Sequence, residues 1–215
     1  MKKTFFYTYL LLSFLLGSCK KNENTESTKI SNSTNTTETT NNTISNTVSA
    51  KNIRIQYQGN LWATLTMEGE KAVIVYENKN ILVHKRKDDK RKYETDGVII
   101  KEIKYKEDGF KLRTPEGNLL WKVKLDDNKI KISNNEENKN PFELKMHESG
   151  KAKIKLNDTE IAESKLKNNK IAVESKGKVF EIENQTFDKA YTILGIEEIL
   201  PQDRLIILVE LLENK

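Results

Sequence analysis

The sequence predicts a mainly β domain: an antiparallel meander of about twelve short strands, barrel-like in form, with one or two apolar C-terminal helices packed in or against it. Two observations in the 215-residue chain lead to this fold class. Between residues 53 and 182, short runs of alternating apolar and polar residues recur about every ten residues, with turn-forming residues between them. After residue 186 the apolar residues change to helical spacing and then to a continuous run.

The N-terminus has the pattern of a secretory signal peptide. Lys2 and Lys3 precede an apolar run over residues 5–16, and small residues follow it. The run has about a dozen residues, whereas a helix needs roughly 20 to cross a bilayer. We therefore expect residues 1–18 to be a cleaved signal peptide rather than a permanent transmembrane helix.

The segment Leu16-Gly17-Ser18-Cys19 resembles the lipobox of bacterial lipoproteins. The resemblance implies that Cys19 receives a diacylglycerol thioether and, with further acylation such as palmitate, becomes the mature N-terminus. Several acyl chains exceed what stable membrane anchoring needs. The lipobox resemblance therefore implies a location in the cell envelope, in the outer membrane or on the outer face of the cytoplasmic membrane. The alternative is an ordinary signal peptide followed by a chance cysteine.

The expected domain organisation after the signal peptide has two parts. Residues 19–50 begin with the lipidated cysteine and continue as a stretch composed almost entirely of Asn, Thr, Ser, Glu and Lys. Such a stretch buries too little apolar surface to offset its conformational entropy, so we expect a disordered tether. Residues 51–215 form a single β-rich domain. Cys19 is the only cysteine in the chain, so this domain folds without an intramolecular disulfide.

The strands of the domain follow from alternation bounded by turns such as Asp108-Gly109 and Lys176-Gly177. They are expected at residues 53–57, 61–67, 72–76, 81–85, 98–104, 110–113, 119–125, 129–133, 142–146, 151–156, 159–164, 170–174 and 179–182.

Two helices are expected at the C-terminus. Phe187 to Leu200 carries apolar residues at helical spacing, with Asp188 near the start. Pro201 suits the first turn of a second helix, because its missing N–H has no partner there. Five consecutive apolar residues, 205–209, cover every face of that helix and predict that it is buried.

A long β meander followed by an apolar C-terminal helix resembles the tubby C-terminal-like superfamily, which includes the LURP-one-related and scramblase proteins. The resemblance covers residues 53–215 and rests on the order of elements, with Phe187-Asp188-Lys189-Ala190-Tyr191 leading into Ile196-Glu197-Glu198-Ile199. It implies a roughly twelve-stranded barrel around a hydrophobic helix. The family's phosphoinositide-binding residues have no counterpart here, and two helices depart from its usual one. A β-sandwich or an α+β domain is the alternative fold.

The sequence contains no recognised catalytic motif. It has no nucleophile elbow, phosphate-binding loop or dinucleotide fingerprint, and its two histidines lack the spacing of metal ligands. We therefore expect no catalytic residues, no metal, no cofactor and no enzyme activity. The formal charge is +5, but lysines and glutamates interleave along the domain, which argues against nucleic acid as a partner.

The densest basic run lies in the segment 85–92, which we expect to be a loop. Its cations are candidate contacts for anionic lipid: Lys85, Arg86, Lys87, Lys90, Arg91 and Lys92. Three functional hypotheses remain. The first is a non-catalytic binding or envelope-support module for an unidentified protein or cell-wall partner, with the membrane contacted through lipid on Cys19. The second is a lipid-binding tubby-like domain, and the third is an enzyme with an unfamiliar site.

Overall fold

The computed structural model describes residues 50–214, which belong to one compact unit, Asn46–Lys215. The predicted signal peptide, Cys19 and nearly all of the predicted tether lie outside the described residues.

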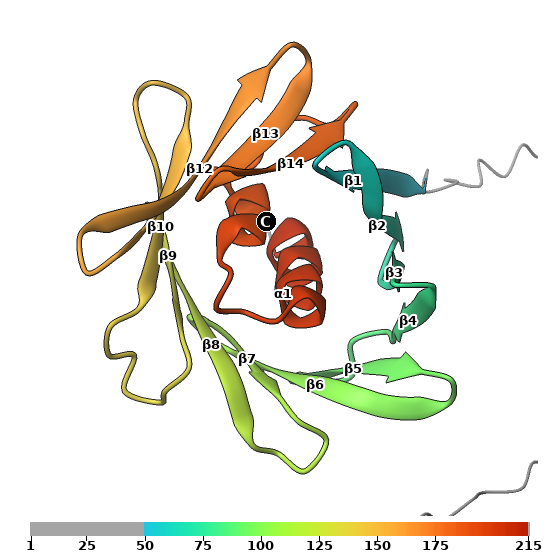
Figure 1. The fold of residues 1–215 in the computed structure, drawn as a ribbon. Helices are drawn as coiled ribbons and strands as arrows, with labels where there is room; N and C mark the ends of the chain where they lie inside the picture. The colour runs from blue at the N-terminus through green and yellow to red at the C-terminus, as the bar shows by residue number, and fades with distance from the viewer. Residues whose placement is uncertain (1–49, 215) are drawn as a thin grey trace, which may run out of the picture. The chain divides into compact units, whose positions relative to one another are not determined.

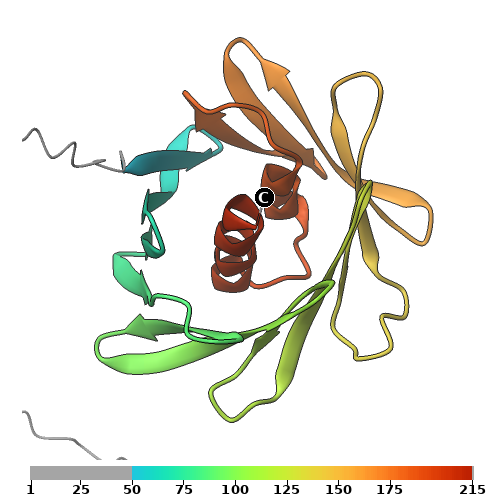
Figure 2. The ribbon, with the colours of Figure 1, turned by 180° about the vertical axis from the view of Figure 1, so that it is seen from behind.

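The described part contains fourteen antiparallel strands that close into a barrel (Figures 1 and 2). Each strand pairs with its neighbours in sequence, and β1 pairs with β14 to complete the ring, with Ile55 opposite Ile182 and Tyr57 opposite Phe180. The closed ring confirms the predicted β meander and excludes the sandwich alternative. The strands are β1 (Lys51–Tyr57), β2 (Asn60–Glu68), β3 (Lys71–Tyr76), β4 (Lys79–Val83), β5 (Lys90–Thr95), β6 (Val98–Lys106), β7 (Gly109–Arg113), β8 (Leu119–Asp126), β9 (Lys129–Ser133), β10 (Phe142–Met146), β11 (Ala152–Leu156), β12 (Thr159–Lys167), β13 (Lys170–Ser175) and β14 (Lys178–Glu183).

Tight turns between successive strands use residues that tolerate a left-handed backbone. Asn168 and Asn169 both have positive φ, 50° and 60°, between β12 and β13. Asn157 and Asp158 do the same between β11 and β12, with φ of 48° and 65°. Two successive left-handed residues match the twist of the flanking strands, which is why Asn and Asp recur here.

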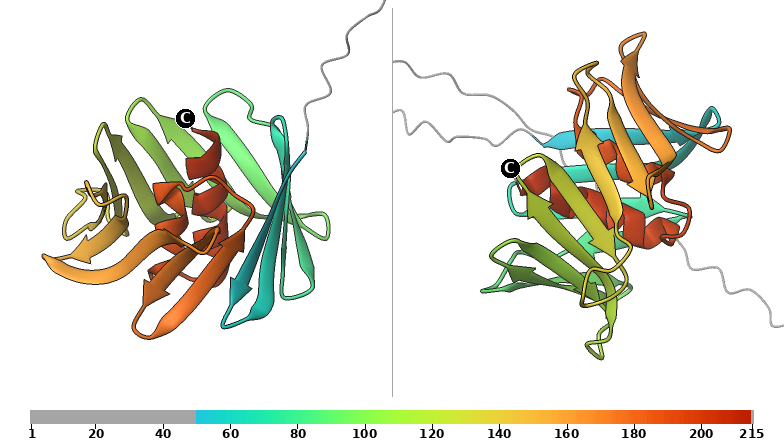
Figure 3. Two further views of the ribbon diagram at one scale, coloured as in Figure 1. Left: turned by 90° about the horizontal axis from the view of Figure 1, so that it is seen from above. Right: turned by 90° about the vertical axis from the view of Figure 1, so that its left-hand side faces the viewer.

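Two helices occupy the interior of the barrel (Figures 1 and 3). η1 (Lys189–Gly195) is a 3-10 helix and α1 (Pro201–Glu213) is an α-helix. Their side chains are almost all buried, and Ile206 and Leu208 on α1 are fully inaccessible. A barrel of about eight strands is filled by its own side chains, whereas one of 16–18 strands leaves a water-filled channel. Fourteen strands therefore enclose more space than wall side chains fill, and the helices complete the core.

The structure corrects two predictions. The barrel has fourteen strands, one more than the thirteen ranges expected from the sequence, because β5 was expected to be part of a loop. The first C-terminal helix was expected over residues 187–200 but is the seven-residue η1. Asp188 does cap it, accepting a hydrogen bond from the Ala190 N–H at 2.8 Å. η1 ends at Gly195, where a Cβ atom would lie 2.5 Å from the Ala162 Cβ on the barrel wall. The end of η1 therefore packs too closely against β12 for a residue larger than glycine.

Candidate functional site

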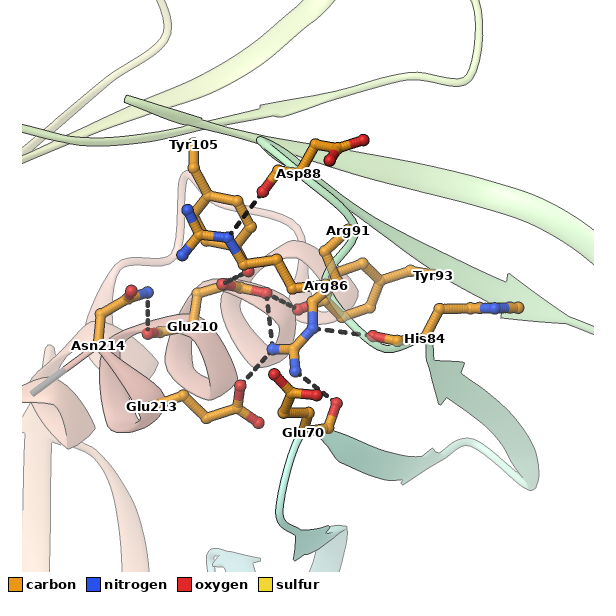
Figure 4. A network of polar contacts seen from close by, with 10 residues as sticks. All are labelled: Glu70, His84, Arg86, Asp88, Arg91, Tyr93, Tyr105, Glu210, Glu213 and Asn214. Carbon is orange, nitrogen blue, oxygen red and sulfur yellow. Dashed lines mark hydrogen bonds and ion pairs between the residues drawn. The ribbon is translucent and has the colours of Figure 1, made fainter. Parts of the chain in front are cut away.

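A buried polar cluster joins the interior helix to the barrel wall (Figure 4). We call it the Glu210 cluster; it comprises Arg91 and Tyr93 of β5, Tyr105 of β6, and Glu210 and Glu213 of α1. The Glu210 side chain is fully inaccessible. Its carboxylate accepts hydrogen bonds from the Tyr93 hydroxyl at 2.5 Å and the Tyr105 hydroxyl at 2.6 Å. Three wall residues thus converge on one carboxylate near the C-terminal end of the chain.

Arg91 supplies the positive charge of the cluster. Its Nη1 donates to Glu210 at 3.3 Å and also to Glu213. The other nitrogens donate to backbone carbonyls, Nη2 to Glu70 at 2.7 Å and Nε to His84 at 2.9 Å. All three guanidinium nitrogens therefore have acceptors, and a buried charge with this many partners is stabilised rather than left unpaired.

Burial and the central carboxylate shift the ionisation of the surrounding groups. Burial raises the pKa of Tyr93 well above its usual value, and the Glu210 charge raises it further. The same two causes raise the pKa of Tyr105. Burial also raises the pKa of Glu213, even though the hydrogen bond from Arg91 opposes the shift.

Shifted pKa values occur at active sites, but the geometry here favours a structural role. Tyr93 and Glu210 are fully inaccessible, so a substrate has no path to their oxygens. Every charge of the cluster faces a partner across the boundary between α1 and the wall. We conclude that the Glu210 cluster fixes α1 in the lumen.

The structure separates the six cations predicted as a lipid contact. Arg91 is 3% exposed and points into the barrel, so it is not available to a membrane surface. The other five are exposed, in the β4–β5 connection and at the start of β5: Lys85, Arg86, Lys87, Lys90 and Lys92.

The exposed cations are partly neutralised. Lys85 lies 2.7 Å from Glu70, and Lys90 lies 3.1 Å from Glu102. The Arg86 guanidinium stacks 3.8 Å above the centre of the Tyr105 ring. Two further carboxylates, at positions 88 and 89, lie within the segment itself. Five exposed cations therefore lie among four carboxylates, and the local excess of positive charge is small.

The sequence patterns described above do not identify Glu210 or its tyrosine partners as a cluster. One local signal was available: Glu210 is the only charged residue within the apolar stretch 205–212. A charged side chain on a helix that is buried all round requires a buried partner. The identity of that partner could not be predicted from the local sequence, because Arg91 lies 119 positions earlier in the chain.

Within residues 50–214, no group of three or more His, Cys, Asp or Glu side chains is placed to hold a metal ion. His84 forms a 2.9 Å contact with the Glu94 carboxylate on the barrel exterior. No helix of the described part has the length and apolar character needed to cross a membrane.

Neither a protein-family model, nor a curated protein, nor a solved structure matches this chain.

Proposed function

We propose that this chain is a lipid-anchored binding module of the bacterial cell envelope that recognises a protein or cell-wall partner without catalysing a reaction. The observation that supports this proposal most directly is the filled lumen. η1 and α1 occupy the space in which an open barrel would hold a ligand (Figure 2). A partner must therefore meet the outer wall or the ends of the barrel.

The buried charges support a scaffold role. Ion pairs connect α1 to the wall: Arg91 with both Glu210 and Glu213, and Lys101 with Asp203 at 3.2 Å. Buried pairs of this kind resist rearrangement, because separating the partners would leave an uncompensated charge. The barrel is thus a rigid body that presents a fixed outer surface, carried by the proposed lipid anchor at Cys19.

The anchor is tested by expressing the full chain in a bacterial host and partitioning it between detergent-rich and aqueous phases. Mass spectrometry of the N-terminal peptide is expected to show acyl chains on Cys19 and loss of residues 1–18. The variant Cys19→Ser should move to the aqueous phase. Ser18→Ala keeps a small residue before the cysteine and should still be processed and lipidated. Membrane association of Cys19→Ser equal to that of the parent would contradict the proposal.

A second candidate function is recognition of anionic lipid by the barrel itself. It is supported by the exposed cations of the β4–β5 segment and by the resemblance to the tubby-like superfamily, although this barrel has fourteen strands and that family's about twelve. Weighing against it, carboxylates lie among these cations, and two of the lysines are ion-paired. We therefore rank lipid recognition below recognition of a protein or wall partner.

Co-sedimentation with vesicles distinguishes the two functions. The unlipidated mature chain, residues 19–215 with Cys19→Ser, is mixed with neutral or anionic vesicles at low and high salt. The leading proposal expects no binding to either kind. Salt-sensitive binding to anionic vesicles alone, lost when Arg86, Lys87 and Lys92 are changed to Gln, would favour the lipid function instead.

A further inference from the structure

A pocket of about 210 Å³ lies where one end of the barrel meets the connection between η1 and α1. It is lined by residues from β1, β2, β13 and β14 of the wall and by residues of η1, of the connection and of α1. The lining residues that matter here are Tyr57, Trp62, Lys178, Phe180, Glu197 and Arg204. We call this space the Arg204 pocket.

Contiguous aromatic rings form one wall of the pocket. The Trp62 and Phe180 rings are 5.1 Å apart in an edge-to-face arrangement, and Tyr57 lies 4.8 Å from Phe180. Tyr76 extends the same group, 5.1 Å from Trp62. Such a wall offers flat apolar faces on which another ring can pack.

Arg204 lies against this wall. Its side chain is buried, with the residue 8% exposed, and its guanidinium carbon lies 5.6 Å from the Trp62 ring centre and 5.8 Å from that of Phe180. Nη1 donates to the Leu194 carbonyl, which is the one hydrogen bond of this guanidinium within residues 50–214. Nε is buried and has no acceptor among the described residues.

The two buried arginines of the barrel differ in their partners. Arg91 contacts two carboxylates and two carbonyls. Arg204 contacts one carbonyl and no carboxylate within the part of the chain that the structure describes. A buried cation normally requires a counter-charge, so the Arg204 pocket is electrostatically incomplete where the Glu210 cluster is complete.

Glu197 and Glu198 act on the Arg204 charge from a distance, but among the described residues no carboxylate forms an ion pair with it. Glu197 is held by Lys178 at 2.9 Å, so this carboxylate is already paired. The first turn of α1 lies at the same place, with Pro201 at the start of the helix and no side chain capping it. The positive end of the helix dipole therefore adds to the positive potential around Arg204, and the acidic residue of this first turn, Asp203, is paired with Lys101.

We propose that the Arg204 pocket binds a small organic anion, a carboxylate carried on a single flat ring, with the carboxylate on the Arg204 guanidinium and the ring against Trp62 and its aromatic neighbours. The volume equals about seven water molecules at roughly 30 Å³ each, which suits one ring with one acidic group and is too small for a nucleotide. This proposal names a ligand class for the proposed binding module. The biological role of this ligand rests on the proposed binding function, whereas the evidence that a ligand binds comes from the geometry of the Arg204 pocket.

The test is a nuclear magnetic resonance titration of the mature chain, residues 19–215 with Cys19→Ser. Benzoate is the probe, benzamide is its neutral analogue, and inorganic phosphate is an anion without a ring. Benzoate is expected to shift the signals of the Trp62 indole N–H, the Gly195 amide and the Arg204 Nε–H. The Trp121 indole, on β8 across the barrel, is the internal reference and should not shift.

Benzamide and phosphate are each expected to bind about tenfold more weakly than benzoate or worse, because one lacks the charge and the other the ring. The variant Arg204→Gln should lose at least as much benzoate affinity, whereas Lys92→Gln, which removes a charge elsewhere, should bind as the parent does. If Arg204→Gln fails to fold, the affinities of the parent protein for benzoate, benzamide and phosphate decide whether the pocket requires both the charge and the ring. Equal affinity for benzoate and benzamide, phosphate binding as tightly as benzoate, shifts elsewhere, or no shift at millimolar benzoate would each overturn the proposal. Lipidation of Cys19 is measured independently, so failure of the anchor and failure of the pocket remain distinguishable.

Discussion

Replacing Arg91 by methionine tests whether the Glu210 cluster fixes α1 inside the barrel. Methionine keeps much of the side-chain volume but removes the charge and all the donors. The fully inaccessible Glu210 carboxylate would keep only its two tyrosine donors. Two backbone carbonyls, of Glu70 and His84, would also lose a donor.

The size of the effect follows from these losses. Removing one partner of a buried ion pair costs about 3–5 kcal/mol. The loss of two hydrogen bonds acts in the same direction. We expect Arg91→Met to lower the free energy of unfolding by about 3–5 kcal/mol and the melting temperature by roughly 10 °C.

Urea unfolding at pH 7, followed by circular dichroism, measures this change on the unlipidated mature chain. Lys92→Met is the matched control, because Lys92 is the next residue of β5 and is exposed. It is expected to change stability by less than about 0.5 kcal/mol. The double variant Arg91→Met with Glu210→Gln should recover part of the loss, since the fully buried carboxylate is removed and only Glu213, whose side chain is 20% exposed, is left without its cation. Equal stability of Arg91→Met and Lys92→Met would refute the structural role of the cluster.

Two further predictions concern the buried core. Because the pKa values of Tyr93 and Tyr105 are raised in the folded state, their contribution to stability is complete below the ordinary value of 10.0 and is lost as pH rises above it. Tyrosinate absorbance of these residues should therefore appear together with loss of the β circular dichroism signal, and ionisation without unfolding would contradict the prediction. Gly195→Ala should cost about 1–3 kcal/mol in urea unfolding, because the new Cβ would lie 2.5 Å from the Ala162 Cβ. Combining it with Ala162→Gly should restore part of that loss, and no restoration would show that the cost arises elsewhere.

The sequence was sufficient for the parts of the fold that depend on local pattern. Thirteen of the fourteen strands were located, because one face of each strand is apolar and a turn follows it. In β2, for example, the inward residues Ala63 and Leu65 are buried, as alternation predicts. The apolar run 205–209 likewise predicted a fully buried helix, and α1 is one.

The exception among the strands is informative. β5 was not predicted as a strand because its inward-facing residues are Arg91 and Tyr93, which do not form an apolar face. They face inward because Glu210 lies opposite them inside the barrel. The polar residues at the inward positions of β5 are thus explained by a residue of α1. The local sequence of β5 contains no information about that partner.

The sequence by itself determined that a meander of strands would precede a helix buried all round. Only the tertiary structure decided that fourteen strands close into one ring, that both helices enter its lumen, and that Arg91 and Arg204 are buried with different partners. The physical reason is the range of the interactions. Alternation and helix periodicity depend on residues a few positions apart, whereas barrel closure and charge pairing join residues more than a hundred positions apart, as between β1 and β14 or between Arg91 and Glu210.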